Sequence, residues 1–305
     1  MKKCLVLGAG GFIGKNLCKE LSKEYKVIAF DIIRPLELEN IENVEICIDN
    51  FVDKQDFSDV LQGVEKVFHF VSTTLPTEKT SHIDKEIIEN VVPTVRLLES
   101  MVKCNVKEII FASSGGTVYG ETDGHYNKVT DPLNPICSYG VQKKVIESYL
   151  EFYGLYYGIN YKIVRISNPY GIGQNPNKPQ GVIPIFIYRL LLGQPITIYG
   201  DGNNQRDYIY MDDLIRALSK VAEYNGEQHI FNIGSGNAHT LHEIIDIIVD
   251  KSKMDFSEIT YKDIRKCDVS KTLIDISVTK KELGWSPDVD ISEGVSLVID
   301  YYKHQ

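Results

Sequence analysis

Two residues near the middle of the chain have the types and the spacing that proton transfer requires. Tyr139 and Lys143 lie four positions apart in the segment SYGVQK, which opens a predicted helix. On a helix this spacing places both side chains on one face, one turn apart. The pKa of an isolated tyrosine is about 10, and a nearby ammonium lowers it by favouring the phenolate. The pair therefore predicts a general acid or base that works near neutral pH.

A glycine-rich turn near the N-terminus indicates dinucleotide binding. Gly8, Gly11 and Gly14 fall in GAGGFIG, between an apolar strand-like run and residues with helical apolar spacing. One glycine makes the tight turn, one lets a pyrophosphate approach the backbone, and one lets the helix pack closely on the sheet. Amide groups at the helix start face the anion, so Phe12 and Ile13 are expected beside the same cofactor.

Acidic residues follow the next two predicted strands. Asp31 lies 20 residues after Gly11, where a dinucleotide-binding fold places the acid that binds the adenosine ribose. A carboxylate there repels a 2′-phosphate and favours NAD over NADP, although Arg34 would weaken that preference. Asp49 ends the following predicted strand, and Asn50 comes directly after it.

The elements that position these residues alternate along the first half of the chain. Strands are predicted over residues 4–7, 26–31, 44–49, 64–71, 107–112 and 161–166, with helices over 12–21, 84–104 and 138–157. This alternation predicts an α/β fold, a Rossmann-type doubly wound parallel sheet. We expect an NAD-binding domain over 1–168, with a return of the chain around 205–230. A smaller mixed α/β substrate domain is expected over 169–305.

The predicted strand over residues 64–71 contains His69 and is followed by Ser72, and we expect different roles for these two residues. Ser72 follows this strand at the carboxyl edge of the sheet, where ligands of open α/β sheets bind. His69 lies inside the apolar run and is interpreted as a packed core histidine.

Composition and charge narrow the possible partners. The chain has 305 residues, 43% of them apolar, and a net charge of −9. Such a surface does not favour nucleic acid or anionic membranes. The six cysteines form no paired motif, so we expect reduced thiols and no metal site. No signal peptide or bilayer-spanning run is recognised, which predicts a cytoplasmic protein.

These motifs together resemble the extended short-chain dehydrogenase/reductases, the sugar-nucleotide epimerase and dehydratase group. The resemblance covers nearly the whole chain and ends in the segment LGWSP at residues 283–287. It implies cofactor roles for the residues introduced above and for Asn90, and it makes Tyr139 and Lys143 the catalytic pair. Lys143 would also bind the nicotinamide ribose.

The second half of the chain resembles the substrate-binding segments of the same group. The resemblance implies that Asn168 holds a substrate pyrophosphate, that Tyr199 packs on the nucleobase, and that Arg206 and Arg265 bind the diphosphate. Arginine suits that role because its guanidinium meets phosphate in a bidentate fashion.

One position departs from the family pattern. The catalytic Ser or Thr of the family precedes the Val of the Val-Tyr-Gly segment by three residues, and here that position is Gly115. Either Ser114 or Thr117 supplies the missing hydroxyl, or Tyr139 acts without a neighbouring hydroxyl group. The family's dehydratases carry an Asp-Glu pair where this chain has Gly116 and Thr117, so dehydration is not expected.

The resulting hypothesis is an NAD-dependent nucleotide-sugar 4-epimerase that acts by transient C4 oxidation, with Tyr139 as the base. A UDP-hexose such as UDP-glucose, UDP-galactose or an N-acetyl form is the expected substrate, although the base and sugar stay open. The alternative is an NAD(P)H-dependent reductase of a nucleotide-linked 4-keto-6-deoxy sugar. A non-catalytic nucleotide-binding protein has only Gly115 in its favour. Apolar residues on the helices over 84–104 and 139–157 predict a homodimer.

Overall fold

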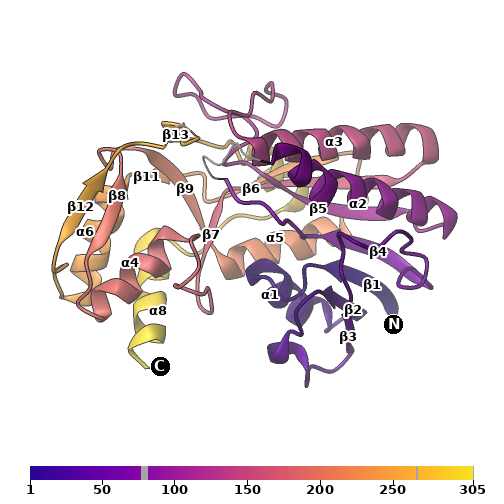
Figure 1. Ribbon diagram of the computed structural model, residues 1–305, viewed down its shortest axis with the longest axis horizontal. Coiled ribbons are helices and arrows are strands. Elements are labelled where there is room, and N and C mark those ends of the chain that lie inside the picture. Colours follow the sequence, from indigo (N-terminus) through magenta and orange to yellow (C-terminus); the bar gives the residue numbers. More distant parts are fainter. Residues whose placement is uncertain (77–81, 266, 305) are drawn as a thin grey trace. The chain divides into compact units, whose positions relative to one another are not determined.

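The computed structural model describes residues 1–76, 82–265 and 267–304 (Figure 1). Its contacts divide the chain into two compact units. The first unit comprises residues 1–114, 137–165 and 218–231, and the second comprises 115–136, 166–217 and 232–305.

A seven-stranded sheet organises the first unit, in the order β10-β6-β5-β4-β1-β2-β3. Its strands are β1 (Lys2–Leu7), β2 (Tyr25–Asp31), β3 (Val44–Ile48), β4 (Val64–His69), β5 (Glu108–Ser114), β6 (Asn160–Ile166) and β10 (Ile230–Ile233). β1 pairs in parallel with β2, Leu7 opposite Phe30, and with β4, Leu7 opposite His69. The strand order reverses between β1 and β4, and open α/β sheets bind their ligands at the carboxyl ends of the strands beside such a reversal.

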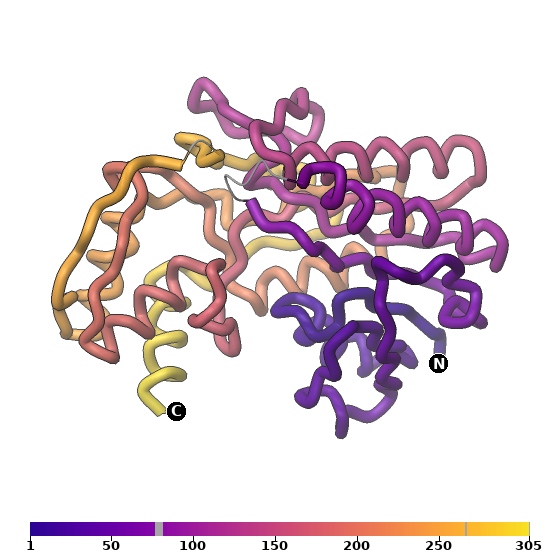
Figure 2. Tube along the Cα trace, viewed as in Figure 1, coloured from indigo at the N-terminus to yellow at the C-terminus, as the bar shows by residue number. Residues whose placement is uncertain are grey.

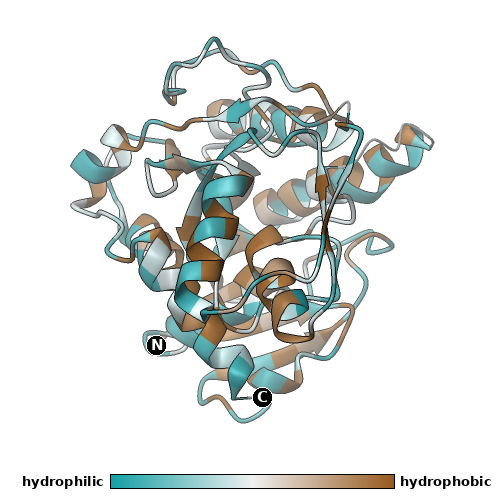
Figure 3. Ribbon diagram, turned by 90° about the vertical axis from the view of Figure 1, so that its left-hand side faces the viewer, coloured by the Kyte–Doolittle hydropathy of each residue, from teal (hydrophilic) through white to brown (hydrophobic). Residues whose placement is uncertain are grey.

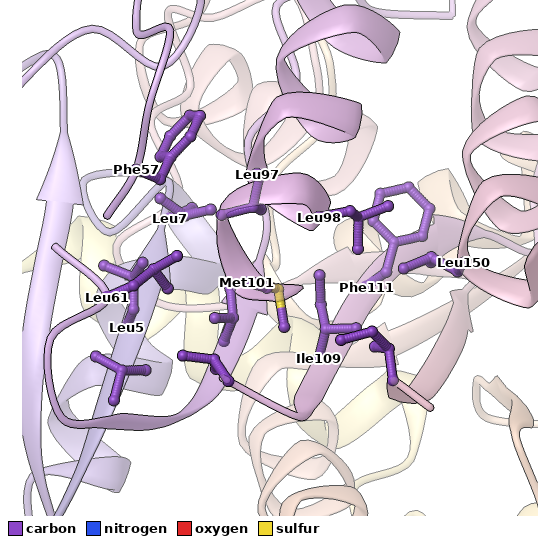
Figure 4. Packing of buried hydrophobic residues seen from close by; sticks show 14 of the residues in the cluster. Leu5, Leu7, Phe57, Leu61, Leu97, Leu98, Met101, Ile109, Phe111 and Leu150 are labelled. Atoms are coloured by element: carbon purple, nitrogen blue, oxygen red, sulfur yellow. The ribbon is translucent and has the colours of Figure 1, made fainter. Parts of the chain in front are cut away.

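Helices cover both faces of this sheet. They are α1 (Phe12–Leu21), α2 (Ile83–Lys103) and α3 (Ser138–Tyr157), with a short 3-10 turn η1 (Leu36–Leu38) after β2. α2 and α3 pack side by side on one face, and α1 lies on the other (Figures 1 and 2). In Figure 4, Leu97, Leu98 and Met101 of α2 pack with Ile109 and Phe111 of β5 in the main core.

The second unit has shorter elements. Its strands are β7 (Asn168–Tyr170), β8 (Ile196–Tyr199), β9 (Gln205–Tyr210), β11 (Ala238–His239), β12 (Ile259–Lys262) and β13 (Lys271–Thr272). Its helices are α4 (Val182–Leu191), α6 (Leu241–Ser252), α7 (Ser277–Leu283) and α8 (Ile291–Lys303), and α5 (Met211–Glu223) leads back to the first unit. Helices in Figure 3 carry both hydrophobic and hydrophilic residues, as expected when one side of each helix is packed.

Local signals in the sequence account for the ends of two helices in this unit. Thr240 and Glu243 form a capping box at the start of α6, with both reciprocal hydrogen bonds present. Asp290 precedes α8 and accepts a hydrogen bond from the Glu293 amide at 2.9 Å. Trp285, in the segment LGWSP, is buried and donates from Nε1 to the Asp213 carbonyl oxygen at 3.2 Å.

The division between the units differs from the expected domain boundary at residue 168 in two places. Residues 115–136 belong to the second unit, because Asn127 pairs with Leu273 (N to O, 2.8 Å) and the Ser270 amide donates to Glu121 at 2.8 Å. The returning segment is 218–231, shorter than the expected 205–230, because β9 pairs with β7, β11 and β13 of the second unit.

The structure confirms that His69 is a packed core residue. Its ring lies 5.0 Å from Phe51 and 5.4 Å from Phe111, centroid to centroid, and its Nε2 is 2.8 Å from Thr94 Oγ1. Burial lowers the pKa of His69 to about 3. Cys4, Cys18, Cys47 and Cys104 are free thiols. Within the described ranges, every helix is too short or too polar to cross a bilayer.

Candidate active site

The glycine turn after β1 has the geometry of a phosphate cradle. Gly8 has φ +84°, and the Gly11 amide donates to the Gly8 carbonyl oxygen at 3.0 Å. A Cβ at Gly14 would lie 2.0 Å from that oxygen, and a Cβ at Gly8 would lie 3.0 Å from the Val71 nitrogen. α1 begins directly after Gly11 without a side-chain cap, so its first amide groups are open to an anion. The turn therefore fits a dinucleotide pyrophosphate, with Phe12 and Ile13 in the first helical turn.

Asp31 ends β2 against this turn. Its Oδ2 accepts from the Gly10 amide at 2.8 Å, and its Oδ1 accepts from the Ile33 amide at 3.0 Å. Two backbone hydrogen bonds orient the carboxylate beside the glycines. The structure thus brings together the glycines and the acid that the sequence separates by 20 residues.

Asp49 lies one strand further along the sheet edge. Its backbone amide donates to the Asp31 carbonyl oxygen at 3.1 Å, and its carboxylate accepts from Lys54 Nζ at 2.6 Å. The hydrogen bond from Lys54 holds the pKa of Asp49 below its usual value. Asn50 uses its side-chain oxygen to accept from the Val52 amide at 3.0 Å. Both residues therefore lie at the edge of the sheet that also carries Asp31.

The segment after β4 is held by α2. Asn90 Oδ1 accepts from the Thr73 amide at 2.9 Å, and Asn90 Nδ2 donates to Thr73 Oγ1 at 2.9 Å. Ser72 Oγ donates to the Thr74 carbonyl oxygen at 3.0 Å. Asn90 thus acts here on the loop backbone, a contact that the sequence did not predict.

Tyr139 and Lys143 lie on the same side of α3, as their spacing predicts. Lys143 Nζ is 5.5 Å from the Tyr139 ring centroid and 4.7 Å from that of Phe111. It also donates to the Ala112 carbonyl oxygen of β5 at 2.7 Å. The lysine is buried, so this hydrogen bond and the two rings fix the position of its ammonium.

Burial dominates the electrostatics of this pair. It raises the pKa of Tyr139 to about 12, and the hydrogen bond with Ser114 opposes that rise. It lowers the pKa of Lys143 to about 8, against the favourable field of Glu147 one turn further along α3. The expectation that Lys143 brings the tyrosine pKa toward neutrality is therefore not met by this pair alone, because desolvation of the phenolate is the larger effect.

A small pocket brings together the Tyr139–Lys143 pair and two residues that were predicted apart from it. Ser72, Asn90, Tyr139 and Lys143 line it, with Val71, Thr74, Gln142 and Ile146. Gln142 was missed by the sequence reasoning. Gln142 lies three residues after Tyr139, so the helical period that selected Lys143 also places Gln142 beside the pair.

A buried ion pair lies one turn beyond Lys143. Arg165 of β6 donates from Nη2 to Glu147 Oε2 at 2.7 Å and from Nε to Oε1 at 3.2 Å. Ser113 of β5 also donates to the Glu147 carboxylate. Glu147 and Arg165 are 2% and 3% exposed. This network joins α3 to β5 and β6 one helical turn beyond Lys143.

In the second unit, Asn168 and Arg206 lie on the paired strands β7 and β9. Asn168 Nδ2 donates to the Asp207 carbonyl oxygen at 2.8 Å. Arg206 Nη2 lies 4.0 Å from Asp268 Oδ1. Arg206 Nη1 donates to the Gln205 carbonyl oxygen of the same strand at 3.0 Å. A 4.0 Å ion pair is loose, so this guanidinium keeps hydrogen-bonding capacity for an anion.

Arg265 and Tyr199 are in direct contact. The guanidinium carbon lies 3.8 Å from the centre of the Tyr199 ring, a cation–π geometry. The Asp268 amide donates to the Arg265 carbonyl oxygen at 3.1 Å, so the turn that carries Arg265 also carries the carboxylate facing Arg206. Lys266, within the segment that resembles the family, lies outside the described residues. The four predicted substrate-binding residues thus form two groups, Asn168 with Arg206 and Tyr199 with Arg265. The turn over residues 265–268 links the groups, because it carries both Arg265 and Asp268.

The two candidates for the missing hydroxyl at Gly115 differ in their surroundings. Ser114, in the first unit, is hydrogen-bonded to Tyr139. Thr117 is in the second unit, and its buried Oγ1 has no hydrogen-bond partner among the residues that the structure describes. An unpaired buried hydroxyl is costly, whereas the Ser114 hydroxyl already has a partner.

A dinucleotide cradle at the strand-order reversal, beside a Tyr-Lys pair whose lysine is buried, defines a Rossmann-type α/β enzyme. More narrowly, the chain belongs to the NAD dependent epimerase/dehydratase family, whose sequence profile matches residues 4–234. The predicted family, the fold and NAD as the cofactor are thereby confirmed.

Known proteins are similar to this chain over its full length. It is 34% identical over 304 residues to the dTDP-4-dehydro-6-deoxyglucose reductase of Escherichia coli, which covers 97% of this chain and 96% of that protein. It is 29% identical over 311 residues to the UDP-glucose 4-epimerase of Mycolicibacterium smegmatis, covering 99% of each. The crystal structure of the Thermotoga maritima UDP-glucose 4-epimerase with UDP-glucose superposes with a TM-score of 0.92, at 33% identity and 99% coverage of both chains.

Proposed function

We propose that this enzyme is a nucleotide-sugar 4-epimerase that acts on a UDP-hexose. The observation that carries the proposal is the pair of Tyr139 and the buried Lys143. They line one pocket with Ser72 and Asn90, in the unit that holds the NAD cradle. The solved relative from Thermotoga maritima, a UDP-glucose 4-epimerase, supports the substrate class.

The proposed mechanism assigns the proton steps to Tyr139. The chemistry that NAD supplies when bound is reversible hydride exchange with a carbon atom. The Tyr139 oxygen takes the proton of the sugar 4-hydroxyl as C4 is oxidised, and returns it after the opposite face of the 4-keto sugar is reduced. Lys143, fixed by the Ala112 carbonyl oxygen, adds positive charge near the phenol. The redox cycle is closed, so no external reductant is consumed.

Substrate binding is proposed for Asn168, Tyr199, Arg206 and Arg265. Two arginines supply the charge that a diphosphate requires in a protein of net charge −9. The loose Arg206–Asp268 pair and the stacking of Arg265 on Tyr199 support this assignment, because both guanidinium groups keep donors for phosphate oxygens.

A second candidate function is reduction of a nucleotide-linked 4-keto-6-deoxy sugar with NADH. The relative from Escherichia coli, named as a dTDP-4-dehydro-6-deoxyglucose reductase, favours it. Gly115 keeps this candidate open as well, because the hydroxyl that the family carries at this position is missing.

One assay separates the two candidates. The purified protein is incubated with UDP-glucose, UDP-galactose or UDP-N-acetylglucosamine, without added cofactor, and the products are separated by chromatography. Formation of the C4 epimer supports the epimerase. Absence of conversion of every UDP-hexose, together with NADH oxidation by a 4-keto sugar nucleotide, would replace the epimerase with the reductase.

Replacement of Thr117 by Val is expected to reduce kcat by about 100-fold, the cost of removing one positioned donor. Stability is expected to be unchanged or slightly higher, because the buried Oγ1 has no partner among the described side chains and backbone groups. Activity and thermal melting are measured on the same preparation. Ser114→Ala is the companion variant, and an unchanged kcat for Thr117→Val would assign the hydroxyl role to Ser114 or to neither residue.

We also propose a homodimer that pairs α2 and α3 with the same helices of a second copy. Apolar residues at helical spacing remain exposed along α3, namely Val141, Val145, Tyr149, Phe152 and Tyr156. Ile83, Ile87 and Ile88 are exposed on the adjacent α2. Continuous exposed apolar surface on neighbouring helices is typical of a protein–protein interface.

A double substitution, Val145→Asp with Phe152→Asp, is expected to yield a monomer. It places two charges in the proposed interface, and burying unpaired charge is strongly unfavourable. Light scattering at micromolar concentration measures the mass. Leu192→Asp, which changes an exposed apolar residue of the second unit, is the control. A monomeric unsubstituted protein, or a double variant that stays dimeric, would contradict this arrangement.

A further inference from the structure

Three cations on the elements that flank Asp31 are paired with two carboxylates of the η1 turn. Lys15 Nζ of α1 lies 2.9 Å from Glu37 Oε1, and Lys19 Nζ lies 3.6 Å from Glu37 Oε2. Arg34, three residues after Asp31, donates from Nε to Glu39 Oε1 at 2.6 Å. The two carboxylates thus form ion pairs with Lys15 and Lys19, which follow the glycine turn, and with Arg34, which follows β2.

The η1 turn presents its two carboxylates to opposite partners. Leu38, between Glu37 and Glu39, is fully buried and anchors the turn. Its amide donates to the Pro35 carbonyl oxygen at 2.9 Å, and the Glu39 amide donates to that of Leu36 at 3.2 Å. Glu37 therefore faces α1 while Glu39 reaches back to Arg34.

NADP differs from NAD by a phosphate on the adenosine 2′-hydroxyl, and a protein that binds it needs a cation near that position. Arg34 is suitably close to Asp31 in the chain, and Lys15 follows the glycine turn. In the structure each of these cations already has a carboxylate partner. A 2′-phosphate would have to displace those carboxylates and also overcome the charge of Asp31.

We propose that Glu37 and Glu39 are specificity-determining residues that exclude NADP by neutralising Lys15, Lys19 and Arg34. Asp31 supplies the direct repulsion, and the two glutamates keep neighbouring cations from compensating for it. The hydrogen bond from Lys15 lowers the pKa of Glu37, which keeps that carboxylate ionised. The inference rests on the proposed placement of the adenosine ribose at Asp31.

The charges can be changed without loss of the fold. The Glu37 and Arg34 side chains are 57% and 62% exposed, and their partners Lys15 and Glu39 are 13% and 35% exposed. Water therefore reaches both ion pairs, and such pairs contribute little to stability. The anchoring of η1 by Leu38 is independent of either carboxylate. Glu37→Gln and Glu39→Gln keep the shape of the side chains and remove only their charge.

The test is equilibrium binding of NAD and NADP to the full chain freed of nucleotide, measured by calorimetry. The variants are Asp31→Asn alone and Asp31→Asn with Glu37→Gln and Glu39→Gln. The matched control combines Asp31→Asn with Glu42→Gln and Glu45→Gln, which removes two exposed carboxylates elsewhere on the same unit. The fragment 2′,5′-ADP is a second probe, because it carries the 2′-phosphate without the nicotinamide.

The triple variant is expected to bind NADP and 2′,5′-ADP about tenfold more tightly than Asp31→Asn alone, because freed cations make charge-assisted hydrogen bonds to phosphate. This gain is expected to shrink as salt rises. The NAD affinity of the triple variant is expected to stay close to that of Asp31→Asn. An equal gain in the control, or no gain in the triple variant, would overturn the inference. Failure of the unsubstituted protein to bind NAD would instead overturn the proposed cofactor site.

Discussion

Replacement of Tyr139 by Phe is expected to reduce turnover of the nucleotide sugar by about 100- to 10,000-fold, the range for loss of a general acid or base. The substitution removes one oxygen from a side chain that lines the pocket with Lys143. NAD binding is expected to persist, because the glycine cradle and Asp31 are unchanged. Steady-state kinetics measure the loss, and titration with NAD measures the retained affinity.

The matched control is Tyr157→Phe, which removes the same atom from an exposed tyrosine at the end of the same helix. It is expected to have unsubstituted activity. Both variants are expected to melt close to the unsubstituted protein, since neither opens a cavity. If Tyr139→Phe retained turnover within tenfold of the unsubstituted enzyme, Tyr139 would not be the base in either the epimerase or the reductase mechanism.

Replacement of Glu147 by Leu is expected to destabilise the protein by about 3–5 kcal/mol, the cost of removing one partner of a buried ion pair. The Arg165 guanidinium is 3% exposed and would lose the carboxylate that now accepts its Nε and Nη2 donors. The Ser113 hydroxyl would lose its acceptor as well. Chemical denaturation monitored by circular dichroism measures the change.

A double variant distinguishes the loss of the ion pair from any effect of the new side chain on α3. Glu147→Leu with Arg165→Met replaces both charges by apolar side chains, and such exchanges are often neutral in stability. The double variant is therefore expected to recover most of the loss. A single variant within about 1 kcal/mol of the unsubstituted protein would mean that the guanidinium finds other partners, and that the pair contributes little to the fold.

Residues close together in the sequence determined the cofactor and the fold class. Gly8, Gly11 and Gly14 specify a turn that only small residues can make. In the structure, a Cβ at Gly14 would lie 2.0 Å from the Gly8 carbonyl oxygen. The alternation of strand and helix patterns then predicts a parallel sheet. The spacing of Tyr139 and Lys143 is likewise local, since one helical turn suffices to bring them together.

The tertiary structure decided what these residues can do, because burial and long-range partners are absent from any local pattern. Burial raises the pKa of Tyr139 to about 12, which reverses the effect expected from Lys143. The boundary between the units differs from the predicted one because residues 115–136 hydrogen-bond to the segment near residue 273. The neutralisation of Arg34 depends on a turn anchored by one buried leucine. Desolvation of a side chain and its ion pairing depend on residues that are distant in the sequence, so a short stretch of sequence does not predict them.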